Sequence, residues 1–504
     1  MVFRGRVSRS CENCRAVKRR CDQQVPHCGQ CRRMGEDCPG YRDEWELMFR
    51  NQTDMTIKRS KGKSTRRRAV VKTQQNNTNR PGHGLAPGVD ELGVNYFLHN
   101  FVIGGKSPSH GYLNYIPAVY MADGEHPTLV SSMAAVGLVA LARSTQQPEL
   151  VQYARAKYSE AIGHVNHALA SPTESVKDST LMAVISLGVF ELGFDVDLWV
   201  RHVQGAAALV VLRGKKQFTS KASILMFNQV RADMVIACLH TVQPFPPEIV
   251  ELQQAATDHS DTSSAFWLLG VLAPRCANVF HRFTRNTGEI PWLELLEEAT
   301  GVQDDIEHIA SLLEVQAPYT TTYESTADPD RVYNGRVDVY ASFWAIRVWN
   351  NMRNCQIIVS QIVCSLLTTA LDTDLAPDLA PDLKAYCRAK LKETLQLLVK
   401  IGDDMLASIP QALGLTSGSN TISTQSKPQS SMNPSPLPSH TSLSAGLMLL
   451  WCLYTVGMSP VITSKARRWV IQRMTDIGKN AGISFALHLV KDLVRSDELL
   501  IDSP

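Results

Sequence analysis

The chain has 504 residues, of which 44% are hydrophobic and 20% are charged, and its formal net charge at pH 7 is +3. This near-neutral total conceals two different regions, because residues 1–72 carry a net charge of +11 and the remainder carries −8. A basic region of this kind suits the phosphates of DNA, whereas the acidic remainder would be repelled by them. The most apolar stretch, Ala445–Met458, is short for a bilayer span, so we expect a buried helix there.

The most specific pattern in the chain is a set of six cysteines near its start. Gaps of two, six, six, two and six residues separate them, so that one pattern is written twice: Cys11, Cys14, Cys21, Cys28, Cys31 and Cys38. Two tetrahedral zinc ions need eight ligand positions, and six thiolates supply them if two sulfurs each bridge both ions. The spacing therefore predicts a binuclear zinc cluster with two ions per chain.

The alternative is that these cysteines form disulfides or are six unrelated buried thiols. Disulfides persist in oxidising compartments. The chain opens with Arg4, Arg6 and Arg9 and has no apolar stretch behind them, so we expect no signal peptide to deliver it to such a compartment. The thiols are therefore expected to stay reduced and to bind metal.

The segment from Ser10 to Cys38 resembles the zinc binuclear cluster domain of fungal transcription factors. It matches that motif at every cysteine, at Lys18 between the second and third, and at Pro26 in the connecting loop. The resemblance implies one bridging pair of cysteines and two further pairs that complete one ion each, namely Cys11 with Cys28, Cys14 with Cys21, and Cys31 with Cys38. We expect this domain to span residues 1–45.

The two halves of the cysteine pattern differ in charge. When the first three cysteines are laid over the last three, the basic Lys18, Arg19 and Arg20 fall on residues 35–37, which read Gly-Glu-Asp. Glycine commonly ends a helix, and phosphates repel acidic side chains. We therefore expect the first half to contact DNA and the second half to brace it.

A helix of about two turns is expected after Cys11, with Ser10 as its cap. Such a helix would place its basic residues on one side, because side chains three and four positions apart are neighbours. The resemblance implies that Lys18 reads a CGG triplet in the major groove, where lysine donates to guanine O6 and N7. The other basic residues are expected to hold phosphates, namely Arg9, Arg15, Arg19 and Arg20. The alternative is a merely solvated basic face.

Residues 46–88 are expected to form a disordered basic linker, because blocks of like charge repel one another. Seven of its basic residues lie close together, namely Lys58, Arg59, Lys61, Lys63, Arg66, Arg67 and Arg68. Such a run suits nuclear import, and the alternative is a plain charged tether. No apolar heptad is sustained through three repeats, so we expect no coiled-coil zipper here, and any dimerisation lies elsewhere.

From residue 89 to residue 504 the apolar residues recur at helical spacing. We expect helices over 126–145, 150–169, 174–192, 199–212, 221–242, 337–370, 382–406, 444–459 and 462–497. No convincing run of alternating strand residues is found. The body is therefore predicted to be all-α, as one large domain or two tightly packed ones, with a disordered Ser/Pro-rich insert at 416–442.

This helical body is similar to the regulatory domain that follows the cluster in many of these fungal proteins. Two short segments carry the resemblance, namely Trp199-x-x-His202-x-x-Gly205-Ala206 and Leu212-Arg213-Gly214. The chain has no P-loop, dinucleotide glycine pattern, nucleophile elbow or HExxH motif. We therefore predict no enzymatic activity, identify no small-molecule substrate, and interpret His202 as a residue of helix packing.

Together these patterns predict a nuclear, zinc-dependent, sequence-specific DNA-binding regulator of RNA polymerase II transcription, whose helical domain controls or transmits its activity. Its expected partners are double-stranded DNA, transcriptional coregulators and, if it dimerises, a second copy; no membrane is expected. The family resemblance suggests control of a metabolic pathway, such as a secondary-metabolite gene cluster. The alternative is a zinc-stabilised nuclear scaffold that binds partners without recognising promoters directly.

Overall fold

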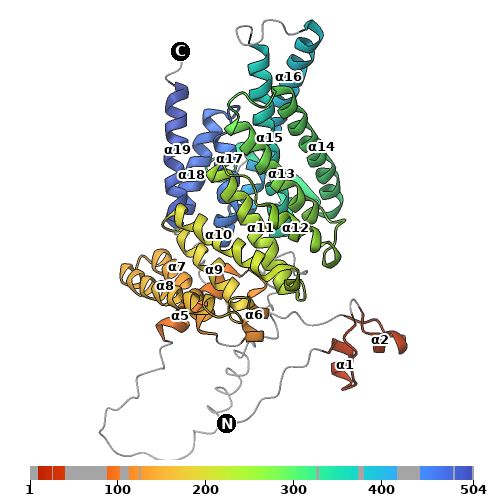
Figure 1. The fold of residues 1–504 in the computed structure, drawn as a ribbon, viewed down its shortest axis with the longest axis vertical. Coiled ribbons are helices and arrows are strands. Elements are labelled where there is room, and N and C mark those ends of the chain that lie inside the picture. The colour runs from red at the N-terminus through yellow and green to blue at the C-terminus, as the bar shows by residue number, and fades with distance from the viewer. Residues whose placement is uncertain are drawn as a thin grey trace, which may run out of the picture. The chain divides into compact units, whose positions relative to one another are not determined.

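The chain divides into two compact units in the computed structural model, residues 1–87 and residues 88–504. The structure describes residues 10–24, 27–39, 88–102, 113–123, 126–324, 328–372, 380–416, 443–480 and 483–501. Figure 1 shows the small unit with its two short helices and the large helical unit. The predicted linker up to residue 87 and the predicted insert from residue 417 lie outside the described residues.

The small unit contains two short helices, α1 (Glu12–Ala16) and α2 (Gly29–Arg33). Each begins directly after a cysteine, Cys11 or Cys28, which takes the N-cap position. The expectations of Ser10 as the cap and of a two-turn helix were therefore wrong. Among the described residues of this unit, the buried hydrophobic side chains are four cysteines, with two more packed against them: Cys11, Cys14, Cys28, Cys31, Cys21 and Cys38. A module whose described core consists of cysteines depends on metal for its fold.

The large unit begins with six helices: α5 (Val89–Phe101), α6 (Ile116–Asp123), α7 (Pro127–Ser144), α8 (Pro148–Leu169), α9 (Asp178–Glu191) and α10 (Val196–Arg213). α7 packs against α5, α8 and α9, and most of its side chains are buried. Proline opens both α7 and α8 at the first helical position, where its missing N–H costs nothing. The four helices predicted between residues 126 and 212 are all observed.

The rest of the unit is arranged around α15, which packs against α13, α14, α16 and α17. Its helices are α11 (Lys221–Thr241), α12 (Pro247–Ala255), α13 (Ala265–Arg285), α14 (Trp292–Gln316), α15 (Phe343–Leu371), α16 (Pro381–Ala412), α17 (Leu443–Gly457), α18 (Ser464–Asn480) and α19 (Ser484–Ile501). Three short 3₁₀ turns join them, η2 (Gly214–Gln217), η3 (Thr257–His259) and η4 (Tyr333–Gly335). The predicted helix 462–497 is two helices, α18 and α19, so that prediction was wrong in its continuity.

The body also contains an antiparallel pair of strands, β1 (Tyr319–Tyr323) and β2 (Arg336–Tyr340). The expectation of no strand was wrong at this point. The helix predicted over 337–370 begins only at Phe343, because β2 occupies the first residues of that range. Ser342 ends the extended segment and caps α15 by accepting a hydrogen bond from the N–H of Ala345.

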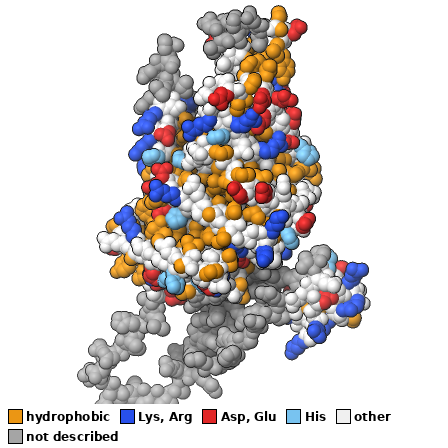
Figure 2. All heavy atoms as spheres, in the orientation of Figure 1, with side chains coloured by type: hydrophobic (Ala, Val, Ile, Leu, Met, Phe, Trp, Pro, Cys, Tyr) orange, Lys and Arg blue, Asp and Glu red, His pale blue; other side chains and the backbone are white. Residues whose placement is uncertain are grey.

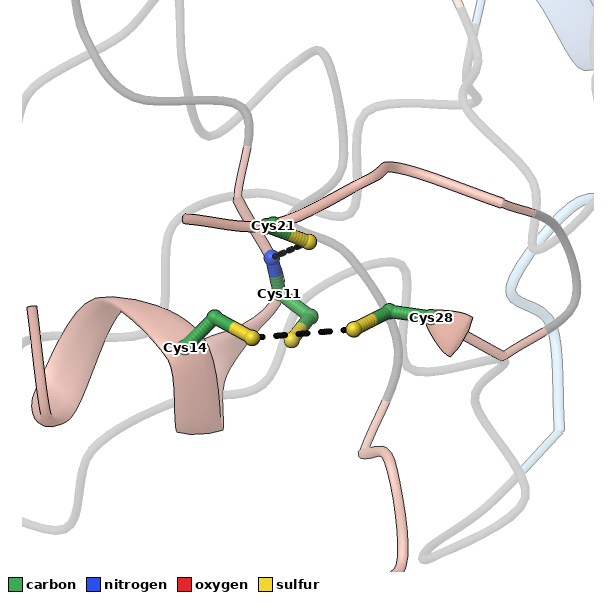
Figure 3. A group of neighbouring side chains, drawn as sticks. All are labelled: Cys11, Cys14, Cys21 and Cys28. Atoms are coloured by element: carbon green, nitrogen blue, oxygen red, sulfur yellow. Dashed lines mark hydrogen bonds between the residues drawn. The ribbon is translucent and has the colours of Figure 1, made fainter. Parts of the chain in front are cut away.

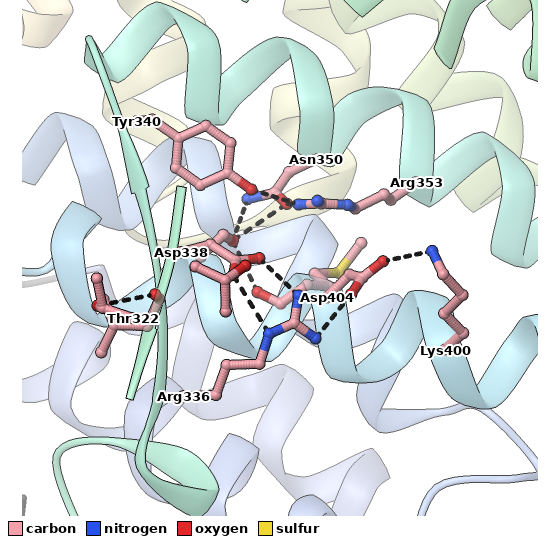
Figure 4. A network of polar contacts seen from close by, with 12 residues as sticks. Thr322, Arg336, Asp338, Tyr340, Asn350, Arg353, Lys400 and Asp404 are labelled. Atoms are coloured by element: carbon pink, nitrogen blue, oxygen red, sulfur yellow. Dashed lines mark hydrogen bonds and ion pairs between the residues drawn. The ribbon is translucent and has the colours of Figure 1, made fainter. Parts of the chain in front are cut away.

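A network of polar contacts joins the strands to α15 and α16 (Figure 4). Arg336 on β2 pairs with Asp338, at 3.1 Å, and with Asp404 on α16, at 2.8 Å. Arg353 on α15 donates to the hydroxyl of Tyr340 at 2.8 Å. In this network Arg336 pairs with the carboxylates of both Asp338 and Asp404, which lets these charges lie beside the apolar core.

Within the described ranges, three helices are long and apolar enough to cross a membrane by length and composition, namely α7, α11 and α15. In the large unit 72%, 56% and 67% of their most apolar windows are buried. Packing inside the fold therefore accounts for their composition. The apolar stretch Ala445–Met458, predicted to be a buried helix, forms most of α17, and its side chains Leu449, Leu450 and Leu453 are buried.

Candidate metal centre and nucleic-acid interface

The two halves of the small unit repeat one backbone arrangement around their cysteines. In the first half the N–H of Cys11 donates to Sγ of Cys21 at 3.5 Å, and in the second half the N–H of Cys28 donates to Sγ of Cys38 at 3.4 Å. The first cysteine of each half thus takes the N-cap position of a helix, and its N–H also binds the third cysteine of the same half. The duplicated sequence pattern is therefore a duplicated local structure.

The six sulfurs form two overlapping groups of four, within which all sulfurs lie within 4.8 Å of one another. One group, drawn in Figure 3, contains the first four cysteines and the other contains two of these with the last two: Cys11, Cys14, Cys21 and Cys28, and Cys11, Cys28, Cys31 and Cys38. Cys11 lies 3.6 Å from Cys31, and Cys14 lies 3.6 Å from Cys28, measured between sulfurs. Zinc–sulfur bonds of about 2.3 Å give a tetrahedron with edges of about 3.8 Å, so these spacings fit.

Cys11 and Cys28 belong to both groups. A sulfur common to two tetrahedral sites is a bridging ligand, so the geometry agrees with the bridging pair that the resemblance implies. Within the described part of the chain, no other group of three or more Cys, His, Asp or Glu side chains is close enough to share an ion. Thiolate ligands suit Zn²⁺, and the six cysteines can hold two zinc ions.

Zinc binding at this site requires the loss of protons, because zinc is bound by thiolates. Burial raises the pKa of the Cys11 thiol, and it raises the pKa of Cys28 to about 12 from an ordinary value of 9.0. These two metal-free thiols are therefore protonated at neutral pH. Their protons leave when the metal binds.

Both helices end with the same pair of closing hydrogen bonds, a Schellman motif, but the residue in its left-handed position differs. That residue is Lys18 after α1, with a φ of 52°, and Gly35 after α2, with a φ of 66°. Glycine adopts this conformation freely, whereas it costs a lysine about 1 kcal/mol. Lys18 is exposed, so the first half presents a long basic side chain where the second half presents none.

Arg19 faces the cluster and the other half of the module. Its guanidinium pairs with Glu36 and also donates to two sulfurs, to Cys14 from Nε at 3.4 Å and to Cys31 from Nη2 at 3.6 Å. The hydrogen bond to Glu36 raises the pKa of Arg19, and the same contact lowers the pKa of Glu36. This geometry favours a bracing role for Arg19 over the expected phosphate contact.

The other basic residues expected to contact DNA differ in exposure. Arg20 is exposed, whereas Arg15 is partly buried and its Nη1 has no hydrogen-bond partner among the described residues. Basic side chains project from the small unit in the view of Figure 2. Arg9 and the basic run at 58–68 lie outside the described residues.

Two further polar contacts join the halves, and the sequence pattern gave no signal for them. Asn13 donates from Nδ2 to the carbonyl of Asp37 at 2.8 Å, and the N–H of Gly29 donates to Oδ1 of Asp22 at 2.9 Å. A Cβ at position 29 would overlap the carboxylate of Asp22, so this close approach requires glycine. Each contact takes one residue from either half, which places the halves against each other.

In the large unit His202 packs between helices. Its Nε2 lies 3.0 Å from the hydroxyl of Tyr158 on α8, and burial lowers the pKa of the imidazole. The later cysteines are also buried in the helical body, namely Cys238, Cys276, Cys355, Cys364, Cys387 and Cys452. Neither the histidine nor these thiols form a site like that of the small unit among the residues that the structure describes.

Comparison with protein-family models gives two matches. Residues 9–45 match the fungal Zn(2)-Cys(6) binuclear cluster domain, and residues 94–247 match the fungal specific transcription factor domain. No curated protein and no solved structure matches the chain. With its six clustered cysteines, the chain thus carries a fungal Zn(2)-Cys(6) binuclear cluster domain followed by a fungal specific transcription factor domain, an arrangement that implies DNA-binding transcription regulation.

Proposed function

We propose that this transcription factor recognises CGG-containing promoter sites of RNA polymerase II genes, and that Lys18 reads the guanines. The supporting observation is the contrast between Lys18 and Gly35 at equivalent positions of the two halves. A residue other than glycine held at positive φ costs stability, and such strain is commonly retained where the side chain has a task. An exposed lysine ammonium can donate to guanine O6 and N7.

The surroundings of Lys18 favour the first half as the DNA-facing half. Arg20, two residues after Lys18, is exposed, and Arg15 lies three residues before Lys18. Both can bind phosphates that flank the triplet, as can Arg9, and such contacts fix the register of a protein on DNA. The second half has acids at 36 and 37, which phosphates repel.

The factor is proposed to act in the nucleus, with the basic run at 58–68 as its import signal. The helical domain would control or transmit activity through transcriptional coregulators. A second copy, if one is bound, would pair outside the linker, because the linker sequence has no sustained heptad. Neutralising all seven basic residues of the run and imaging the tagged protein tests the import signal.

The proposed targets are the genes of a metabolic pathway, of which a secondary-metabolite gene cluster is one class. Support for this comes from the family resemblance, which is an analogy and not a property of the site. Mapping the genomic occupancy of the tagged protein would give the binding site, its spacing and the pathway together.

Competition binding tests the recognition itself. Zinc-loaded full-length protein is mixed with a labelled CGG duplex and increasing amounts of an unlabelled duplex, with the triplet either intact or scrambled, at physiological salt. The proposal predicts that the intact duplex competes at least about tenfold better. Equal competition would favour a zinc-stabilised scaffold that does not read promoters.

A further inference from the structure

The large unit contains a cavity of about 190 Å³ walled by α9, α10, α11, α13, α15 and α17. All six helices are labelled in the large unit in Figure 1. A cavity of about 150 Å³ is enough to bind benzene in a protein interior. Most of the wall is apolar, with Val184, Leu269 and Trp451 among its side chains. The cavity therefore has the size and the surface to take a small organic molecule.

One buried cation in the wall has no counter-charge in the part of the chain that the structure describes. Arg231 on α11 is 3% exposed, and its Nη1 has no hydrogen-bond partner among the residues that the structure describes. Burial lowers its pKa to about 10. A buried charge without a partner is costly, so its presence in a cavity wall indicates an anionic ligand.

The charges around the cavity leave an excess of one positive charge. The charged residues among its described lining are Arg231, Asp233 and Arg347. Burial raises the pKa of Asp233 to about 6, and the charge of Arg347 acts against that rise, so these two residues interact. Residues 103–112, which precede the lining residue Leu113, contain no Asp or Glu. Arg231 thus supplies the excess charge.

Two side-chain amides of the wall also have oxygens without partners. Oδ1 of Asn228 on α11 and Oδ1 of Asn354 on α15 are buried and accept no hydrogen bond within the described residues. Buried polar atoms in native proteins are normally paired. Three residues that line the cavity therefore carry buried polar atoms without a partner among the described residues, and one of the three is a cation.

Packing holds the guanidinium of Arg231 in place. It lies 5.5 Å from the ring centre of Trp267 and 5.8 Å from that of Phe227. It also rests on the backbone of α13 at Gly270, where a Cβ would overlap its nitrogens. The aromatic rings orient the cation, and glycine at 270 permits the close approach.

We propose that this cavity binds a small monocarboxylic acid with an apolar body and one hydrogen-bond donor, and that Arg231 binds its carboxylate. The donor would reach Asn228 or Asn354, and the body would fill the apolar space. Because the wall combines helices of the matched range 94–247 with α13, α15 and α17 beyond it, a bound acid would join the two parts of the helical domain. The proposal is independent of DNA recognition.

The test uses zinc-loaded full-length protein with 3-hydroxybenzoate as the probe and 3-hydroxybenzamide as its neutral counterpart, measured by ligand-observed NMR. Wild type should bind the acid at least about tenfold more tightly than the amide, because charge-assisted hydrogen bonds are the stronger ones. Arg231→Met should weaken binding of the acid at least about tenfold. Arg275→Met is the control, because Arg275 lies on α13 with about half of its side chain exposed.

Two further results separate loss of the site from loss of the fold. Arg231→Met should keep the helical circular dichroism and unfold at the same or a higher temperature, since it removes an unpaired buried charge. Gly270→Ala should displace the guanidinium without removing it and should also weaken acid binding. Equal binding of acid and amide, no binding of the acid by wild type, or unchanged binding in Arg231→Met would overturn the proposal.

Discussion

Arg19 and Glu36 occupy equivalent positions in the two halves of the zinc module and bind each other. Each makes the last closing hydrogen bond of the helix before it, Arg19 to the carbonyl of Cys14 and Glu36 to that of Cys31. The guanidinium also donates to the sulfurs of these same two cysteines. Six thiolates and two zinc ions leave a net charge of about −2, and the hydrogen bonds from the guanidinium place positive charge beside two of these sulfurs. The pair therefore joins the halves and stabilises the cluster.

Removing Arg19 is expected to loosen the metal. Arg19→Ala deletes both the contact between the halves and the donors to the sulfurs, so zinc should be released to a chelator several times faster. Glu36→Gln leaves the sulfur contacts in place and should have a smaller effect. Arg20→Ala is the matched control, because Arg20 is exposed. Equal release rates for Arg19→Ala and Arg20→Ala would rule out the bracing role.

Zinc removal is expected to unfold the small unit and leave the helical unit intact. The buried residues of the described small unit are cysteines, whereas the large unit has an apolar core of its own. Metal analysis should give two zinc ions per chain, and chelation should leave the helical circular dichroism nearly unchanged. Cys11→Ala and Cys28→Ala should each be at least as damaging as Cys38→Ala, because they affect both ions. One ion per chain would contradict the cluster.

Arg467 is expected to be a main support of the last two helices. It is 1% exposed, pairs with Asp497 at 3.1 Å and donates to the carbonyl of Gly457 at 3.0 Å. Arg467→Ala leaves these groups without a partner and opens a cavity, so it should lower the free energy of unfolding by about 3–5 kcal/mol. Arg468→Ala, at an exposed neighbour, should change it by less than about 0.5 kcal/mol. Denaturant unfolding measures both, and equal losses would contradict this role.

Asp404 is expected to make the stability of the large unit sensitive to acid. Burial acts to raise its pKa, but hydrogen bonds from Lys400 and Arg336 and the charge of Arg353 bring it below the ordinary value. Since the folded pKa is the lower one, the stabilisation is fully present above about pH 4 and is lost as the pH falls through the folded pKa. Asp404→Asn should be less stable than wild type at neutral pH, and the difference should shrink on acidification. A difference independent of pH would contradict the assignment.

The sequence predicted the zinc ligands because metal coordination fixes their spacing, and it predicted long helices such as α7, α8 and α10 because their apolar residues follow the helical period. The predicted ranges missed α5, α6, α12, α13 and α14, and they missed β1 and β2. The strands have five residues each, and β2 runs directly into the helical pattern of α15, so no separate period marks it. Asn480 with a glycine two residues later was the available signal for the break between α18 and α19.

At the metal site the sequence indicated the charge contrast between the halves. It did not indicate that the basic Arg19 and the acidic Glu36 bind each other. Laying one half over the other places Arg19 opposite Glu36, a pattern that indicates a basic half and an acidic half. That the two side chains meet follows from how the halves pack, which local spacing does not determine. The positive φ of Lys18 also depends on the closing turn of α1, and a lysine gives no local signal for it.

Lys18 is proposed to read guanine from the end of α1, and Lys18→Gly tests this role with the fold preserved. Glycine suits the left-handed position, so the variant should hold zinc at least as well as wild type. The measurement is the ratio of affinities for a CGG duplex and a scrambled duplex, by competition at physiological salt. We expect Lys18→Gly to lower this preference by about 1–3 kcal/mol. An unchanged ratio in a fully zinc-loaded variant would contradict it.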